Sequence, residues 1–162
     1  MQTGRTDDPL AAPPLRLLAD LSVDVGAVLE VGAVPTLGRR RLIPILGGTA
    51  QGPHWRGRVL PGGADFQLIT SERVTLLEAR YVIETDAGDR IYVENRALRS
   101  GPPELIARLA RGEAVDPALI YFRCAPRFEV SAPALQWMME RLFIGCGVRH
   151  SQQVLLRFFE LG

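Results

Sequence analysis

The first regular pattern in the chain is an alternation of apolar and polar residues between positions 15 and 25. Every second residue from Leu17 to Val25 is apolar, and Arg16, Asp20 and Asp24 lie at intervening positions. A period of two residues is typical of a strand with one buried face. We therefore expect a first strand over 15–25 and a folded domain that begins at Leu15.

Glycine and proline divide the next part of the chain into short apolar runs. Gly26 interrupts the first strand and 27–34 resumes it, which indicates a bulge or a bend. The runs 40–45, 54–60 and 65–69 predict three short strands, turned at Gly47-Gly48, Gly52-Pro53 and Pro61-Gly62-Gly63. Neither Gly-Gly pair is followed by helical periodicity, so we expect no phosphate-binding loop.

The second half of the chain predicts longer strands. The runs 73–86 and 90–98 are rich in β-branched and aromatic residues and flank the turn Asp86–Asp89, which favours a hairpin. A strand over 118–130, bent at Pro126, and a strand over 153–161 follow.

Two short helices are expected among these strands. Pro102 suits a first turn and Gly112 can end a helix over 102–111. Ser131 can cap a second helix that carries Leu135, Trp137, Met138, Leu142 and Phe143.

About eight or nine strands, mostly in sequential hairpins, predict a mainly β fold: an antiparallel β-barrel with two short helices. We expect one domain over 15–162 and a flexible N-terminal tail over 1–14, where Pro, Thr, Asp and Gly show no periodicity. A barrel of this size is either filled by its own side chains or holds one small ligand.

The amino-acid composition excludes several classes of function. All 19 basic residues are Arg, which excludes Schiff-base chemistry on lysine and a P-loop. The net charge of +1 and the lack of a long apolar run indicate no nucleic-acid partner and no membrane partner. Cys124 and Cys146 form no Cys-x-x-Cys motif, which favours a reduced, cytoplasmic setting. With His54 and His150 as the only histidines, we expect no metal site and no cofactor.

Several motifs along the chain together resemble domain-of-unknown-function family 3237, a family of small, mainly bacterial proteins. The resemblance runs from about Leu15 to Leu161 and implies a β-barrel without naming an activity. The motifs that carry it are Gly38, Arg41, Pro44, Gly47 and Gly48; Gly62, Gly63, Asp65 and Phe66; Arg80; and Tyr121, Phe122, Arg123, Phe128 and Glu129. Four positions depart from the family pattern, namely Phe66, Ala97, Cys124 and Met139.

Asp65 and Arg123 are the candidate catalytic residues. Asp65 follows a glycine turn at the start of a strand, where it acts either as a general base or as a turn residue that bonds backbone amides. Arginines within apolar strands either clamp an anionic oxygen in the interior or pair with carboxylates on the surface. The candidate ligand-binding residues are Arg41, Arg80, Tyr81, Tyr92, Asn95 and Tyr121, with core packing as the alternative for the aromatic ones.

Two functions remain open. The first is a barrel that binds a small organic molecule, as a cofactor-independent isomerase, cyclase or lyase with an interior Arg and Asp65. The alternative is a non-catalytic structural or partner-binding barrel filled by its own side chains. Either is compatible with a homo-oligomer, in which a second copy covers the apolar segment 135–143. An exposed Trp55 or Trp137 would favour self-association.

Overall fold

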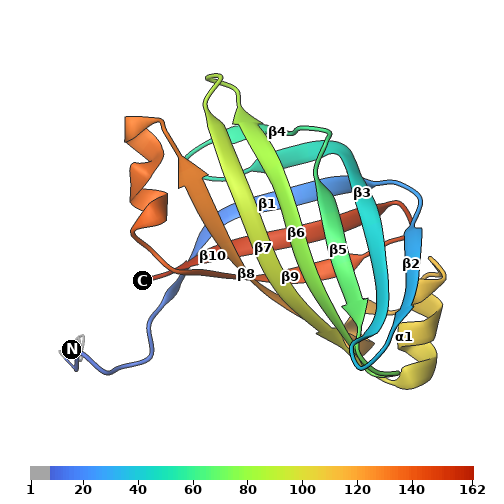
Figure 1. The fold of residues 1–162 in the computed structure, drawn as a ribbon. Helices are drawn as coiled ribbons and strands as arrows, with labels where there is room; N and C mark the ends of the chain where they lie inside the picture. The colour runs from blue at the N-terminus through green and yellow to red at the C-terminus, as the bar shows by residue number, and fades with distance from the viewer. Residues whose placement is uncertain (1–7) are drawn as a thin grey trace.

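The computed structural model describes residues 8–162 as one antiparallel barrel (Figure 1). Its strands are β1 (Leu15–Val25), β2 (Leu29–Val34), β3 (Gly38–Gln51), β4 (Arg56–Val59), β5 (Ala64–Ile69), β6 (Val74–Thr85), β7 (Arg90–Ser100), β8 (Tyr121–Val130), β9 (Phe143–Arg149) and β10 (Gln153–Leu161). The expected mainly β fold is confirmed. Residues 1–7 of the expected tail lie outside the described part of the chain, and 8–14 contain neither helix nor strand.

Pairing of the first strand with two distant strands closes the barrel. β1 pairs with β10 on one side and with the second half of β3 on the other. β4 and β5 lie one after the other between β3 and β6, and each pairs with both of these strands. β2 pairs with the first half of β3. Closure leaves few unpaired strand edges and encloses an interior.

Helical segments lie at the two ends of the barrel (Figure 1). Helix α1 (Pro103–Ala110) follows β7, as expected, and the short 3-10 helix η1 (Pro117–Leu119) precedes β8. The second expected helix is a 3-10 helix, η2 (Pro133–Met139), and the predicted Ser131 cap is wrong because Ala132 is the N-cap without a side-chain bond. Phe143 begins β9 instead, since pairing with β10 holds this segment extended.

The buried face of β1 changes at a bulge. The pairing with β10 shifts register between Leu17 and Ala19, so Leu18 is buried and Leu17 is 42% exposed. From Ala19 to Val25 the expected alternation holds. The prediction of Leu17 as a core residue is therefore wrong, because the extra residue of a bulge reverses the faces that follow.

Two glycine predictions also need correction. Residues 38–51 form one strand of 14 residues, so Gly47-Gly48 bends β3 rather than ending it. The strand pairs with β2 and β5 before this bend, and with β1 and β4 after it. Beyond Gly26, the chain does not continue β1 but forms β2 beside β3. By contrast, Gly62 and Gly63 lie in a true turn between β4 and β5.

Replacement of Gly48 by alanine is expected to lower the free energy of unfolding by at least about 2 kcal/mol. Gly48 has φ +143°, and an added Cβ would lie 2.1 Å from the carbonyl oxygen of Ser22 on β1. The left-handed torsion costs about 1–2 kcal/mol in an alanine, and the forced separation of β3 and β1 adds about 1–3 kcal/mol. Urea denaturation followed by circular dichroism measures the loss.

Gly62→Ala is the matched control, because Gly62 has φ +107° and no atom within 4 Å of an added Cβ. Torsional strain alone is expected there. Equal losses in the two variants would show that the close approach of β3 and β1 has no energetic weight.

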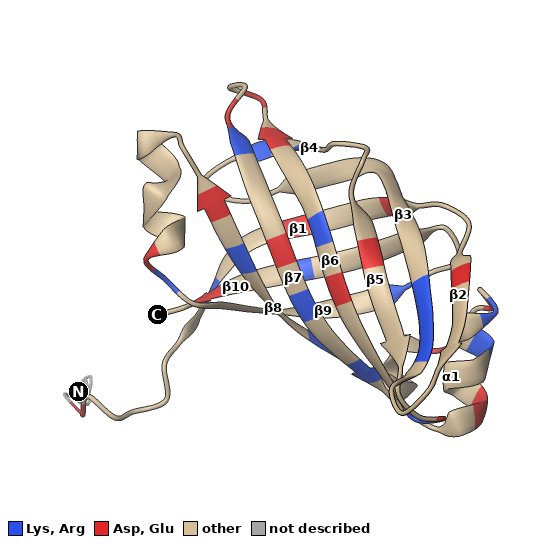
Figure 2. Ribbon diagram, viewed as in Figure 1, with Lys and Arg blue, Asp and Glu red and all other residues tan. Residues whose placement is uncertain are grey.

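The interior is filled in one half and open in the other. Edge-to-face contacts join Phe128 to Phe143 and to Phe158, with ring centroids 5.0 and 6.0 Å apart, and Phe143 also faces Trp137 of η2. These rings fill the end nearest η2. Charged residues lie side by side on β6, β7 and β8 (Figure 2), and Glu84 of β6 pairs with Arg58 of β4 and Arg90 of β7. The aromatic packing leaves the α1 end of the interior for a cavity.

Candidate functional site

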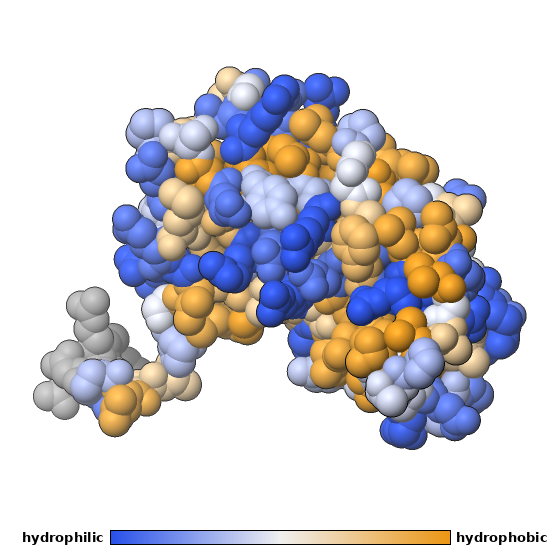
Figure 3. All heavy atoms as spheres, in the orientation of Figure 1, coloured by the Kyte–Doolittle hydropathy of each residue, from blue (hydrophilic) through white to orange (hydrophobic). Residues whose placement is uncertain are grey.

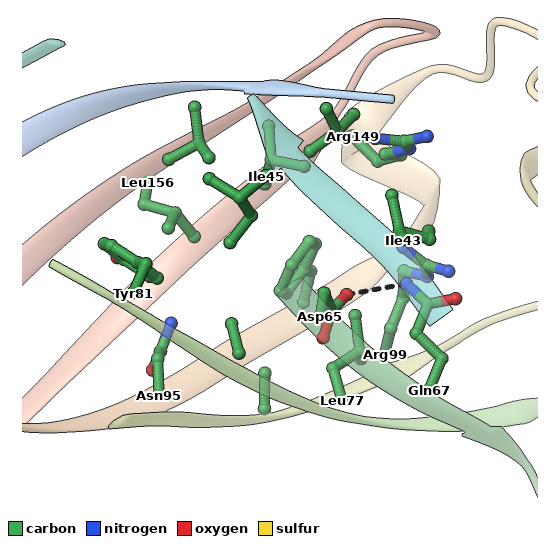
Figure 4. A pocket seen from close by; sticks show the side chains of 16 residues that line it. Ile43, Ile45, Asp65, Gln67, Leu77, Tyr81, Asn95, Arg99, Arg149 and Leu156 are labelled. Carbon is green, nitrogen blue, oxygen red and sulfur yellow. Dashed lines mark hydrogen bonds between the residues drawn. The ribbon is translucent and has the colours of Figure 1, made fainter. Parts of the chain in front are cut away.

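A partly open cavity lies in the barrel interior (Figure 4). About 520 Å³ of it is free of protein atoms, the mouth included, and the centres of water-sized molecules can occupy about 40 Å³. That is room for a few water molecules, so a ligand must be compact. The polar lining residues are Asp65 and Gln67 of β5, Tyr81 of β6, Asn95 and Arg99 of β7, and Arg149 of β9.

A short chain of hydrogen bonds orients the one acidic group of the cavity. Gln67 Nε2 donates to Asp65 Oδ2 at 2.7 Å, and Gln67 Oε1 accepts from Arg41 Nε at 3.1 Å. Arg41 Nη1 donates to the carbonyl oxygen of Ala110 at 3.0 Å, in the last turn of α1. A cation at a helix C-terminus satisfies a free carbonyl and the helix dipole. The contacts therefore fix α1 over the cavity and fix Asp65 inside it.

Unpartnered polar atoms concentrate at this cavity. Six buried side-chain polar atoms within residues 8–162 have no hydrogen-bond partner, and five belong to lining residues. They are Asp65 Oδ1, Tyr81 Oη, Asn95 Oδ1, Arg99 Nε and Arg149 Nη1. A buried polar group without a partner costs about 1–3 kcal/mol. The cavity therefore holds both donors and acceptors that a bound molecule can satisfy.

Burial sets the protonation of the acidic side chains. It raises the pKa of Asp65 above the usual 3.8, against the hydrogen bond from Gln67 and the charges of Arg99, Arg149 and Arg41. Part of Asp65 still reaches solvent, whereas its Oδ1 is covered. Burial also raises the pKa of Tyr81, so its hydroxyl stays neutral. A carboxyl with a raised pKa, beside a neutral hydroxyl, is suited to exchanging a proton with a bound molecule.

Three arginines surround this carboxyl group. Burial lowers the pKa of Arg99 to about 10, and it also lowers the pKa of Arg41 and of Arg149. All three guanidinium groups remain charged at neutral pH. Asp65 opposes the decrease at each of them. The arrangement can stabilise negative charge on an oxygen that enters the cavity.

The structure brings together half of the residues expected from the sequence. Asp65, Tyr81 and Asn95 line the cavity, and Arg41 is buried beside them. Arg80 is exposed and pairs with Glu78 on the outer face. Arg123 lies outside as well, over the exposed ring of Tyr121, with 5.1 Å from Cζ to the ring centroid. Tyr92 is half-buried on the outer face of β7, opposite Glu129 of β8.

Sequence reasoning missed three of the polar groups, namely Gln67, Arg99 and Arg149. Arg99 and Gln67 share strand faces with Asn95 and Asp65, so strand parity could have found them. Arg149 ends β9, a strand that the hydrophobic pattern did not predict.

Comparisons with known proteins agree with this architecture. The chain is 49% identical over 136 residues to a UPF0311 protein of Rhodopseudomonas palustris (strain TIE-1), which covers 84% of this chain and 88% of the relative. A crystal structure of a conserved protein of unknown function from Rhodopseudomonas palustris is 43% identical, with a TM-score of 0.84 over 93% of this chain and 99% of that one.

A more distant neighbour shares the fold alone. It is described as an enzyme from Penicillium herquei, is 18% identical, and has a TM-score of 0.69 over 93% of this chain and 96% of that chain. The model of the family described as "Protein of unknown function (DUF3237)" matches residues 13–161. The chain therefore belongs to this family.

Proposed function

We propose that this protein binds one compact organic molecule inside the barrel and moves a proton on it without a cofactor, as an isomerase, cyclase or lyase does. The observation that carries the proposal is the set of five unpartnered polar atoms around one partly open cavity. A barrel that only packs its own side chains has no use for them, since each costs stability.

Asp65 and Arg99 have the main chemical roles in this proposal. The carboxylate of Asp65 takes a proton from the bound molecule and becomes neutral, and the negative charge left on a substrate oxygen is stabilised by the Arg99 guanidinium. Asp65 then returns the proton to another atom of the same molecule. The raised pKa of Asp65 favours this exchange because both protonation states become accessible. The Penicillium herquei neighbour, described as an enzyme, supports only the capacity of the fold for catalysis.

The proposal is tested by comparing wild type with Ala79→Leu. Ala79 lines the cavity without a polar group, so a leucine there fills the space and leaves Asp65 and Arg99 in place. After a metabolite mixture is added and removed, denatured wild type is expected to release a compact organic molecule that mass spectrometry detects, and Ala79→Leu is not. Circular dichroism shows whether the variant is folded. If wild type releases nothing and a crystal structure shows only water in the cavity, the structural alternative replaces this proposal.

We also propose a cytoplasmic setting, supported by the two free cysteines, Cys124 and Cys146. Within residues 8–162, no helix has the length and apolar character needed to cross a membrane.

Self-association is a separate proposal. Trp55 is buried and Trp137 is half-buried against His54, so neither gives the exposed indole that would favour it. Apolar patches do interrupt the polar surface of the face in Figure 3, and Leu142 near the end of the apolar segment is 73% exposed. Sedimentation velocity at several micromolar concentrations measures the oligomeric state. If the protein is a monomer at all of them, the proposal of self-association is wrong.

A further inference from the structure

The charges inside the barrel do not balance. Arg41, Arg99 and Arg149 bring three positive charges to the cavity, and Asp65 is the one carboxyl group among its lining residues. Glu30 reaches Arg41 from outside, with 3.8 Å between Oε1 and Nη1. Even with both carboxylates ionised, one positive charge is left over.

The excess charge belongs to Arg99 and Arg149. Arg41 has three protein partners, in Gln67, Ala110 and Glu30. Within residues 8–162 neither Arg99 nor Arg149 forms an ion pair, and each has a buried nitrogen without an acceptor. Arg99 is 4% exposed and its Cζ lies 5.7 Å from the ring centroid of Phe122, whereas Arg149 donates one long bond of 3.4 Å to the carbonyl oxygen of Ser151.

An anionic ligand would supply both the missing negative charge and the missing hydrogen-bond acceptors. A buried charge without a counter-charge is costly, and the planar fork of a guanidinium fits the two oxygens of a carboxylate. Asp65 cannot neutralise both arginines, because it carries at most one negative charge. Arg99 and Arg149 therefore need acceptor oxygens that the barrel does not supply.

The opposite end of the cavity has a different chemistry. Tyr81 and Asn95 lie there, away from Arg99 and Arg149, with Leu156 nearby (Figure 4). Asn95 and Arg99 share one face of β7 four residues apart, which places their Cα atoms roughly 13 Å from each other. Asn95 Oδ1 lacks a donor and Tyr81 Oη lacks any partner, so a hydroxyl group of a ligand fits between them.

We infer that the ligand is a compact hydroxy acid, with its carboxylate on Arg99 and Arg149, a short apolar body or single ring in the middle, and a hydroxyl group at Asn95 and Tyr81. This inference rests on the proposed function, since it names the class of molecule that the interior cavity takes. The small enclosed volume limits the ligand to a short body, and a single ring must extend into the open mouth of the cavity.

Calorimetric titration of the full chain near pH 7.5 tests the inference with two acid and amide pairs. The probes are 4-hydroxybenzoate with 4-hydroxybenzamide, and 6-hydroxyhexanoate with 6-hydroxyhexanamide. At least one acid is expected to bind about tenfold or more tightly than its neutral amide, because only the acid supplies two charged oxygens. Inorganic phosphate is expected to bind more weakly than that acid.

Two variants locate the effect. Arg99→Met is expected to remove the preference for the acid, whereas Arg96→Met, three positions earlier on the outer face of β7, is expected to keep it. Amides that bind as well as the acids would overturn the inference and leave interior binding intact. If phosphate binds as tightly as the acids, the inference that the ligand is an organic molecule is overturned. If neither acid binds, the whole inference is overturned. Failure of the proposed function is detected separately, by the absence of any released molecule from wild type.

Discussion

Arg99→Met is expected to raise the free energy of unfolding of the ligand-free protein by about 1–4 kcal/mol. The guanidinium is buried at 4% exposure without an ion pair, and burial lowers its pKa to about 10 because the charged form is poorly solvated there. Methionine keeps much of the apolar stem and removes the charge, so the cost of burying it disappears. Urea denaturation near neutral pH measures the gain. In the presence of an acid ligand that binds the cavity, the order is expected to reverse, since only wild type is stabilised by binding.

Arg96→Met on the same strand is the control, and its expected change lies within about 0.5 kcal/mol. Arg96 is exposed and its contact with Glu94 is a surface pair at 3.4 Å, which contributes little. A loss of more than about 1 kcal/mol in Arg99→Met would show that Arg99 holds the barrel together. The arginine would then not be available to a ligand, and the acid-binding inference would lose its main support.

Strand parity explains how far the sequence leads to this site. On β7, Ile91 and Val93 mark the inner face, and Asn95 and Arg99 follow on the same face at the period of two. On β8 the same argument places Phe122 and Phe128 inside and Arg123 outside. Arg123 and Arg80 match the family pattern, but the strand face on which a residue lies decides the direction of its side chain.

Other parts of the site could not be obtained from local patterns. β9 carries Gly145 and Gly147, whose small size is required because an added Cβ would meet Phe158 and Phe122. Glycines weaken the pattern by which a strand is predicted, so Arg149 had no assigned element. The bend of β3 at Gly47-Gly48 is set by the close approach of β1, from more than twenty residues earlier in the chain. Closure of the barrel depends on contacts between distant parts of the chain, and so does the grouping of Asp65, Arg99 and Arg149.

The aromatic end and the polar end of the interior follow opposite rules. Phe128, Phe143 and Phe158 fill their half with contacts that stabilise the fold. The other half leaves donors and acceptors without partners, which a sequence selected for stability alone would replace by apolar residues. This cost in stability, confined to one end of a well-packed barrel, supports the proposal that the cavity binds a ligand.

Asp65→Asn is expected to lower the rate constant of a reaction at this site by about 10²–10⁴, because an amide cannot take or return the proton. Binding of the substrate is expected to change much less, since Asn can still accept the hydrogen bond from Gln67. Steady-state kinetics with separate values of kcat and KM distinguish the two effects. A variant that retains full kcat would remove Asp65 from the chemistry.

The same substitution is expected to change how stability depends on pH. Below the usual aspartate pKa of 3.8 the carboxyl is protonated in both folded and unfolded chains, so it adds no pH dependence there. Between 3.8 and the raised pKa of Asp65 the folded state binds more protons, and wild-type stability falls as pH rises. Asn does not titrate, so the stability of Asp65→Asn relative to wild type is expected to increase over this interval and then to level off.

Urea denaturation of both proteins between pH 3 and pH 8 measures this difference, with Glu129→Gln on the exposed face of β8 as the control. Glu129→Gln removes a carboxylate from the exposed face of β8, outside the cavity, so it changes the net charge by the same amount as Asp65→Asn. If Asp65→Asn ran parallel to wild type, the Asp65 carboxyl would have an ordinary pKa, and the arginines would already satisfy it. The excess positive charge of the cavity would then be smaller than the burial of Arg99 and Arg149 implies, and the need for an anionic ligand would weaken with it.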